Sequence, residues 1–426
     1  MRYAAGAFSA LFLNMRNPMV LWLVLGLVVL AEWYGYQAVR TLAQHASPGA
    51  RRGVALGYWL LTVAVWGLAI WAGSTRQVGN TVLKSYLMSL PLLLLSAKIV
   101  VLIPLLLEDL TRLARWAVGS ATRPAGVAGE PIPRSEFIAK LALGLGAIPF
   151  IGLLWGMAKG ATDYQVRRVT LKFPNLPPAF DGFKVIQISD LHTGSFSSTE
   201  PLRRAVALIN QQAADLVLMT GDLVNNRATE VEPHIPALQG IKSALPIFSS
   251  LGNHDYGDYV QWGSAAEKRA NLERLMQNHA KIGWTLLNDT SRTIERGGDK
   301  IAVVGVQNWS SHANFPKHGD LPKAHAASGD APFKILLSHD PSHWEAQVLR
   351  YPDIDLTLSG HTHGMQFGVN LPFLKWSPVS YMYKQWAGLY EQGRQKLYVN
   401  VGLGFLGYPG RVGFLPEITL FELRRA

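Results

Sequence analysis

The chain has 426 residues, of which 49% are apolar and only 16% are charged. Soluble domains usually carry about 25% charged residues, so this composition is depleted in charge. The chain contains no cysteine, which excludes a disulfide scaffold, a thiolate zinc site, an iron–sulfur cluster and a thiol nucleophile.

The formal net charge of +11 is unevenly distributed along the chain. Residues 1–173 hold 17 Lys and Arg against 6 Asp and Glu, whereas residues 174–426 hold 23 of each. The basic part is also the apolar part, which is typical of membrane spans with cationic flanks. The neutral second part argues against a nucleic-acid footprint, because that needs a cationic face.

Four apolar stretches precede residue 160, at residues 18–39, 53–72, 85–107 and 137–157. A bilayer core about 30 Å thick needs about 20 helical residues, so each stretch is long enough to span it. We therefore predict a transmembrane region of about four helices at residues 1–160, a linker at 161–181 and a second domain at 182–426. Buried core helices are the alternative interpretation of some of these stretches.

Basic residues in the loops indicate an orientation for this multi-pass cell-membrane protein. The first and third loops carry eight, namely Arg40, Arg51, Arg52, Arg112, Arg115, Arg123, Arg134 and Lys140. The opposite side carries five close to the spans, namely Arg2, Arg16, Arg76, Lys84 and Lys159. The positive-inside rule then places the two loops in the cytoplasm and the second domain outside. If the basic residues of 167–172 are added to the smaller group, both sides carry the same number of basic residues and the rule no longer gives an orientation.

Two charges, Glu32 and Lys98, lie within the first and third predicted spans. An intramembrane charge is costly and is a functional-site candidate. We favour snorkelling or a helix–helix contact, because four spans without a polar stripe are not typical of a transporter.

Beyond residue 181, short β-rich runs recur and several are separated by helical patterns. The runs lie at residues 183–189, 216–220, 247–251, 301–306, 333–338, 356–359, 397–399 and 418–423. The helical patterns lie at residues 200–213 and 265–282. This alternation predicts an α/β domain, in which ligands bind beyond the carboxyl ends of the strands.

Metal-ligating residue types follow five of these runs. The clusters are Asp190-Leu191-His192, Gly221-Asp222, Gly252-Asn253-His254-Asp255, His339-Asp340 and Gly360-His361-Thr362-His363. Glycine precedes three of them, where a backbone must turn sharply to aim a side chain. Two pairs of ligands are spaced two residues apart, which predicts that each pair lies on one side of an extended segment.

The donor types indicate the class of metal and its number. Oxygen and nitrogen donors without sulfur suit Mn, Fe, Zn, Co or Ni. Three Asp or Asn residues and four His residues are too many for one ion, so we expect two divalent metal ions with one bridging carboxylate. Two metals about 3.5–4 Å apart can clamp the oxygens of a phosphoryl displacement and acidify a shared water. The sequence therefore predicts phosphoester hydrolysis without a Ser or Cys nucleophile.

The five clusters, in this order, resemble the calcineurin-like metallophosphoesterase family, whose pattern is D-x-H, G-D, G-N-H-D/E, H and G-H-x-H. The resemblance covers residues from about 180 to the C-terminus. Residues 337–341, 359–364 and 416–418 look like the branch of bacterial membrane-associated phosphodiesterases and UDP-2,3-diacylglucosamine pyrophosphatase-like enzymes. That branch often has Gly where this chain has Met365. The difference leaves the metal ligands intact and affects only what the resemblance implies about the substrate. The implied fold is a four-layer α/β/β/α sandwich with two facing mixed sheets.

The resemblance also implies a role for each matched residue. One metal would take Asp190, His192, Asp222 and His363, and the other would take Asp222, Asn253, His339 and His361, with Asp222 bridging. His254 would stabilise or protonate the leaving oxygen, and Asp255 would orient its ring. His343 is a competitor of His339 as a ligand, but we prefer His339 because it directly follows a strand and expect His343 to be solvated.

Two further features lie outside the matched motifs. Arg411, in the Gly-rich segment 402–413, is a candidate phosphate ligand or a structural residue. The segment 367–386 is apolar and aromatic and follows directly from the last ligand motif. Core packing and a membrane-facing flap beside the site both explain it.

The combined prediction is a membrane-anchored, binuclear-metal phosphoesterase that hydrolyses phosphomonoester, phosphodiester or pyrophosphate bonds. The lipid bilayer is its expected partner, and the tether makes a lipid-linked phosphate an attractive substrate. One alternative is the same chemistry on soluble nucleotides. Another is a membrane scaffold or sensor whose metal site binds without turnover.

Overall fold

The computed structural model describes residues 18–74, 81–122 and 132–426. The chain divides into two compact units, residues 2–156 and 157–426. Four basic residues that enter the orientation count lie outside the described residues, namely Arg2, Arg16, Arg76 and Arg123.

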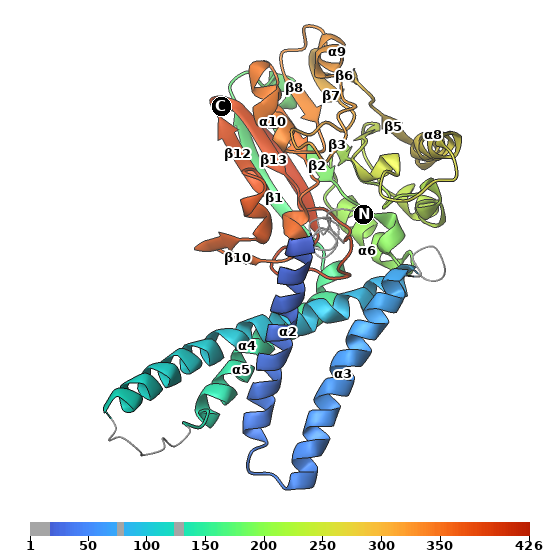
Figure 1. Cartoon of the computed structure of the whole chain (residues 1–426). Coiled ribbons are helices and arrows are strands. Elements are labelled where there is room, and N and C mark those ends of the chain that lie inside the picture. The colour runs from blue at the N-terminus through green and yellow to red at the C-terminus, as the bar shows by residue number, and fades with distance from the viewer. Residues whose placement is uncertain (1–17, 75–80, 123–131) are drawn as a thin grey trace. The chain divides into compact units, whose positions relative to one another are not determined.

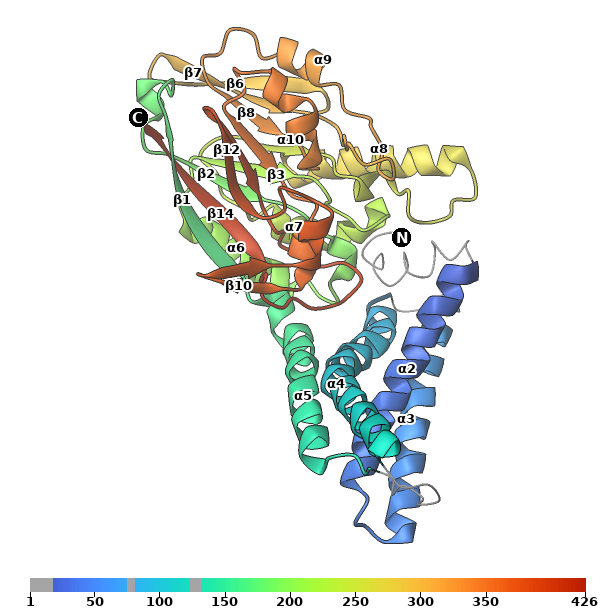
Figure 2. The same cartoon turned by 60° about the vertical axis from the view of Figure 1, so that its left-hand side comes forward.

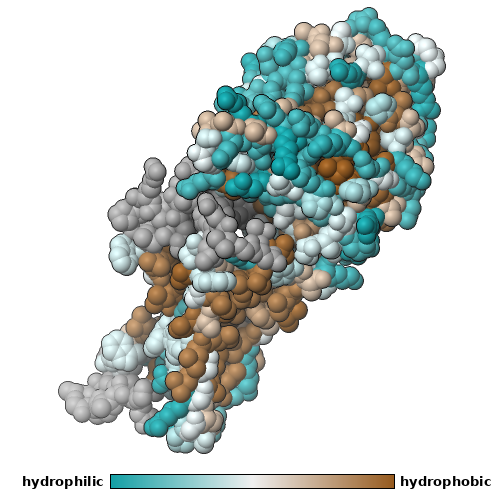
Figure 3. All heavy atoms as spheres, turned by 90° about the vertical axis from the view of Figure 1, so that its right-hand side faces the viewer, coloured by the Kyte–Doolittle hydropathy of each residue, from teal (hydrophilic) through white to brown (hydrophobic). Residues whose placement is uncertain are grey.

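The first unit consists of long apolar helices (Figure 1). They are α2 (Pro18–Leu42), α3 (Pro48–Ser74), α4 (Thr81–Thr122) and α5 (Glu136–Ala158). Each is long and apolar enough to cross a membrane, and Figure 3 shows hydrophobic residues over much of their visible surface. Helix α4 runs past its predicted end at residue 107 because the following segment is rich in the strong helix formers Leu, Arg and Ala.

The two intramembrane charges meet inside this unit. Lys98 of α4 forms an ion pair with Glu32 of α2, and both are buried. The carboxylate also accepts hydrogen bonds from α3, from the side chains of Tyr58 (3.3 Å), Thr62 (3.2 Å) and Trp66 (3.2 Å). One carboxylate therefore connects three helices, as the helix–helix interpretation expects.

Two six-stranded mixed sheets form the second unit (Figure 2). The first contains, in spatial order, β1 (Gln165–Phe173), β14 (Glu417–Arg425), β2 (Phe183–Ile188), β3 (Leu216–Thr220), β4 (Ile247–Ser250) and β5 (Trp284–Leu286). The second contains β12 (Gly388–Gln392), β13 (Gln395–Val399), β9 (Leu356–Ser359), β8 (Lys334–Leu337), β7 (Asp299–Gly305) and β6 (Thr290–Arg296). β2 to β5 are parallel in the first sheet, as are β13, β9, β8 and β7 in the second.

Three hydrophobic clusters stack these elements into layers. The central cluster lies between the sheets and includes Val185 and Leu218 of one sheet and Val303 and Leu358 of the other. A second cluster packs the first sheet against α6 (Glu200–Gln211), α7 (Ile235–Leu238) and α8 (Ala265–Ile282). A third packs the second sheet against α9 (Leu321–Ala326) and α10 (Ser342–Ala346). This order of layers is the predicted four-layer α/β/β/α sandwich.

The expectation did not include β5, β6, β12, α7, α9 or α10, and two further segments also differ from it. Residues 165–173, assigned above to a linker, form β1 and pair in parallel with all of β14. The segment after the last ligand motif contains a small antiparallel hairpin of β10 (Val369–Leu371) and β11 (Leu374–Trp376). Figures 1 and 2 place this hairpin at the end of the unit where β1 begins, whereas α9 lies at the opposite end.

Candidate metal centre

The predicted ligands come together where the carboxyl ends of the two sheets meet. Those of the first sheet follow β2, β3 and β4, and those of the second follow β8 and β9. Two groups of ligand atoms result, each with its members within 4.8 Å of one another: Asp190, His192 and His363, and Asp222, His339 and His361. Each group contains three of the four residues in one predicted ligand set.

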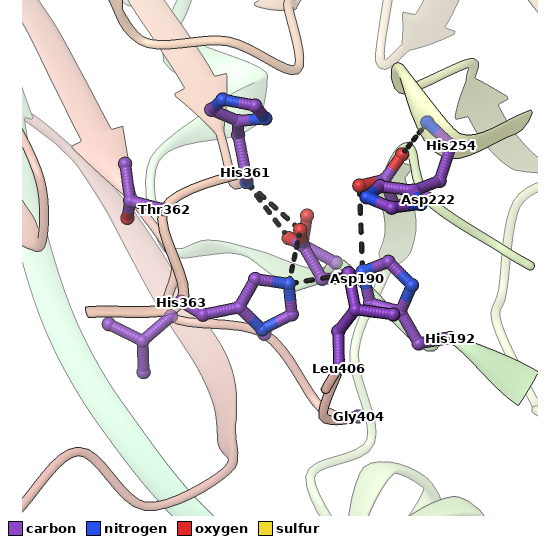
Figure 4. Close-up of polar contacts among 12 residues, drawn as sticks. Asp190, His192, Asp222, His254, His361, Thr362, His363, Gly404 and Leu406 are labelled. Atoms are coloured by element: carbon purple, nitrogen blue, oxygen red, sulfur yellow. Dashed lines mark hydrogen bonds and ion pairs between the residues drawn. The ribbon is translucent and has the colours of Figure 1, made fainter. Parts of the chain in front are cut away.

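In the first group, three ligand atoms face a common point (Figure 4). Nε2 of His363 lies 3.2 Å from Oδ1 of Asp190 and 3.0 Å from Nε2 of His192. Nδ1 of His192 lies 3.1 Å from the amide oxygen of Asn225, which only accepts, so Nδ1 carries the proton. The unprotonated Nε2 of His192 thus faces Nε2 of His363, which carries the proton in the neutral ring because Nδ1 of His363 accepts from Nη2 of Arg411 (3.0 Å). A metal ion bound here would take the place of that proton. This group fits a metal ion.

The second group contains a buried imidazole nitrogen beside a carboxylate. Nδ1 of His339 lies 2.7 Å from the carbonyl oxygen of Thr220 and must donate to it. Nε2 is buried and lies 3.1 Å from Oδ2 of Asp222. Without a metal ion this nitrogen shares a proton with the carboxylate of Asp222. An imidazole nitrogen that faces a carboxylate, with the other ring nitrogen held by a carbonyl, is typical of a metal-binding histidine.

Two tyrosines that the sequence analysis missed orient the remaining ligands. The hydroxyl of Tyr383 donates to Asp340 (3.2 Å), so it accepts from Nε2–H of His361 (2.8 Å). Nδ1 of His361 is then unprotonated, and it faces the amide oxygen of Asn253 at 2.7 Å. The amide nitrogen of Asn253 donates to the hydroxyl of Tyr259 at 2.7 Å. Two acceptors face one another where a cation would bind.

The electrostatics of the site also favour positive charge. Burial opposes ionisation of Asp190 and Asp222, but the neighbouring imidazoles of His363 and His339 outweigh it and hold both carboxyl pKa values below their usual range. Burial lowers the pKa of His339, but the carboxylate of Asp222 outweighs this effect and raises it to about 10. Buried carboxylates need a compensating cation, which divalent metals supply.

The ligand loops are not extended as the spacing predicted. Five ligands have left-handed backbones, with φ of 51° at Asp190, 46° at His192, 57° at Asp222, 70° at His361 and 53° at His363. Such conformations cost on the order of 1–3 kcal/mol each and persist only where the surroundings hold them. The packing around these loops is tight. At Gly221, next to the ligand Asp222, an added Cβ would lie only 2.7 Å from Nδ1 of His339. The two-residue spacing therefore does not reflect an extended segment at these positions.

His254 lies beside the ligands, but Asp255 does not orient its ring. Nδ1 of His254 instead contacts the carbonyl oxygen of Asn225 at 2.8 Å, and its ring lies 4.9 Å from that of His192. The buried carboxylate of Asp255 accepts backbone N–H groups of Asp222 (3.0 Å) and Gly252 (2.8 Å). Burial and the charge of Asp222 raise the pKa of Asp255 to about 7. Asp255 is a positioning residue that joins two ligand loops.

Arg411 is not placed to meet a substrate phosphate. It is fully buried, and its guanidinium donates to carbonyl oxygens of Gly404 (2.6 Å), Val401 (2.7 Å) and Phe414 (3.1 Å). Nη2 also lies 3.0 Å from Nδ1 of His363. We therefore correct the phosphate-binding interpretation. Arg411 stabilises the C-terminal loop and contacts Nδ1 of His363, the ring nitrogen that faces away from the other ligands.

His343, expected to be solvated, is also buried. Its Nδ1 contacts the hydroxyl of Ser338 at 2.7 Å, and Trp309 stacks on its ring at 4.6 Å. Burial lowers its pKa to about 4. It belongs to neither group of ligand atoms.

The fold and the site define a metallophosphoesterase, and comparison with known proteins identifies its family. Residues 183–365 match the family description "Calcineurin-like phosphoesterase", and residues 15–161 match "Probable Calcineurin-like phosphoesterase, transmembrane domain". "Uncharacterized metallophosphoesterase YkuE" of Bacillus subtilis is 32% identical over 305 residues, which cover 69% of this chain and 99% of the relative. The chain belongs to the calcineurin-like metallophosphoesterase family, and it is a multi-pass, metal-dependent phosphoester hydrolase.

Relatives with a membrane region are found in animals. "Transmembrane protein with metallophosphoesterase domain" is 29% identical in Danio rerio over 280 residues, which cover 64% of this chain and 60% of the relative. The Bos taurus protein of the same name is also 29% identical, over 278 residues covering 64% and 60%. This chain therefore spans less than two thirds of the length of these two relatives.

Proposed function

We propose that the site holds two divalent metal ions and hydrolyses a lipid-linked phosphate ester or pyrophosphate. One ion would be held by Asp190, His192, Asp222 and His363, and the other by Asp222, Asn253, His339 and His361. The observation that carries this assignment is the pair of facing acceptors, Nδ1 of His361 and the amide oxygen of Asn253, beside the buried contact of His339 with Asp222. When bound, the metals would stabilise charge on the phosphoryl oxygens and activate a water molecule for attack.

His254 supplies the proton chemistry in this proposal. Its Nδ1–H donates to the carbonyl oxygen of Asn225, and burial lowers its pKa to about 4. Nε2 would therefore have to take up a proton before it could pass one to the leaving oxygen. Asp222 accepts the backbone N–H of His254 at 2.8 Å. The same carboxylate that would bridge the metals thereby fixes the position of the proton donor.

The short connection to the membrane supports a lipid-borne substrate. The fourth candidate span ends at Thr162, and β1 begins at Gln165. Three Cα–Cα steps of about 3.8 Å limit this connection to about 11 Å. A tether this short raises the effective concentration of the catalytic unit at the bilayer surface.

A substrate panel tests this proposal with full-length protein loaded with manganese. We expect a higher kcat/KM for a phospholipid or lipid pyrophosphate in vesicles than for nucleotide diesters. A preference for soluble nucleotides would refute the lipid assignment. Metal binding without turnover of any phosphoester would favour the scaffold alternative instead.

We also propose that the catalytic unit faces outward, on the loop count of eight basic residues against five. A reporter fused after Ala426 should then behave as exported. A cytoplasmic signal from that reporter would reverse the orientation and would point to a substrate of the inner leaflet.

A further inference from the structure

The exposed large apolar side chains of the catalytic unit are confined to one segment. Within residues 157–426, all of which the structure describes, every large apolar side chain that is exposed lies between residues 371 and 389. Six of them, which we call the apolar lip, are Leu371, Phe373, Leu374, Trp376, Tyr381 and Met382. Phe373 is 84% exposed and Tyr381 is 80% exposed. An apolar patch on an otherwise polar unit is typical of an interaction site.

The lip is an ordered structure with a buried base. Leu371 and Leu374 pair across the β10–β11 hairpin, and the indole N–H of Trp376 lies 3.3 Å from the hydroxyl of Tyr381. In the same segment, Tyr383 and Trp386 are buried and pack in one hydrophobic cluster. The base of this segment is therefore core, whereas its tip is exposed.

Hydrogen bonds join the lip to the metal-ligand loop. The hydroxyl of Ser377 donates to the carbonyl oxygen of Gly364 at 2.8 Å. The hydroxyl of Thr362 donates to the carbonyl oxygen of Trp386 at 2.6 Å. Since Thr362 and Gly364 flank the ligand His363, the lip is braced directly against the site.

We propose that the apolar lip inserts into the interfacial zone of the bilayer that holds the chain's own spans. The connection of about 11 Å places the start of β1 next to a span end. Figures 1 and 2 place the hairpin at this same end of the catalytic unit. Tryptophan and tyrosine, which contribute Trp376 and Tyr381 to the lip, are the residues enriched at membrane interfaces.

The contact is apolar rather than electrostatic. The ammonium group of Lys375 donates to the carbonyl oxygen of Ala387 and lies 5.0 Å from the ring of Trp386. Lys384 is paired with Glu345 at 2.6 Å. Both lysines are thus engaged within the protein, so we expect the insertion to depend little on salt.

Single-cysteine labelling tests the insertion directly. Because the chain contains no cysteine, Phe373→Cys and Lys323→Cys each carry one fluorophore in the full-length protein in liposomes. Lys323 is an exposed residue of α9, at the opposite end of the unit. We expect nitroxide-labelled lipid to quench the label at 373 at least about threefold more than the label at 323, in both low and high salt.

Two results would overturn the proposal. Equal quenching of both labels by aqueous iodide would place the lip in water. Protection of the label at 373 from both iodide and nitroxide lipid would show that protein, such as a second copy of the chain, covers it.

Activity measurements then connect insertion to turnover, and this part rests on the proposed lipid-linked substrate. Phe373→Ser combined with Trp376→Ser should lower kcat/KM for a vesicle-borne lipid phosphate by about fivefold or more. Hydrolysis of bis(p-nitrophenyl) phosphate should stay unchanged, and Leu389→Ser, an exposed apolar residue outside the lip, should change neither. Equal loss on both substrates with a lower Tm would show that the lip is core. If the unaltered protein hydrolyses no lipid, the proposed function fails, and the labelling still decides the insertion.

Discussion

Tyr383→Phe removes one oxygen atom and should weaken metal binding at His361 without unfolding the protein. The hydroxyl joins Asp340 to Nε2 of His361, so its loss frees the imidazole to rotate and to change tautomer. Losing the partner that orients a metal-binding histidine typically costs 10- to 100-fold in metal affinity or activity. Oδ2 of Asp340 already lies 3.5 Å from Nε2 of His361, so a direct contact can replace part of the loss. We therefore expect the metal affinity to decrease by an amount near the lower end of this range, about 10- to 30-fold, which corresponds to about 1.4–2 kcal/mol of binding free energy.

The assay is a manganese titration of chelator-treated, full-length protein, with bound metal and activity measured on the same samples. The apparent metal affinity should fall while kcat at saturating metal stays within about twofold. Tyr390→Phe is a matched control, because its hydroxyl accepts the backbone N–H of Trp386 at 3.0 Å in the same chain segment and contacts neither group of ligands. Unchanged metal affinity in Tyr383→Phe, or an equal decrease in both variants, would refute the assigned tautomer of His361.

Three further substitutions test other parts of the site. Asp222→Asn should lower the content of both metals and abolish turnover; retention of both ions in elemental analysis would exclude a bridging role. His254→Ala should keep both metals and lower kcat by about 100-fold or more, as expected for loss of a general acid; loss of both ions would contradict this role. Arg411→Met should leave several buried carbonyl groups unpaired and cost about 3 kcal/mol, lowering Tm by about 5–10 °C for a unit of this size; an unchanged Tm would show that the loop does not depend on it.

The ligands could be predicted because their signal is local. An apolar run of four to six residues, then one small residue and then Asp or His, specifies both a strand and what lies at its carboxyl end. Asp190, Asp222 and His339 follow β2, β3 and β8 in this way. The two sheets bring these ends together, so short motifs distant in the chain meet at one site.

Residues that act through tertiary contacts could not be found in this way. Tyr383 lies 22 positions from His361 and contacts it only because the chain folds back beneath the lip. Arg411 stands out in the sequence as a candidate residue in a Gly-rich segment. Because arginine is seldom fully buried, the sequence does not indicate that its side chain points into the core. β1 did carry a signal, an alternation of apolar and polar residues from Val169 to Phe173, which its cationic start obscured. Left-handed backbones at non-glycine ligands are rare and follow from the surrounding structure.

The pairing of Glu32 with Lys98 has a consequence for how the chain is made. The two residues lie in α2 and α4, so translation delivers the carboxylate two helices before its ammonium partner. Each unpaired charge at the centre of a span costs roughly 2.5–3.5 kcal/mol on insertion. Tyr58, Thr62 and Trp66 of α3 arrive in between and offer the carboxylate neutral donors. We therefore expect stepwise membrane integration, in which contacts with α3 offset part of the cost of Glu32 until Lys98 of α4 has been synthesised.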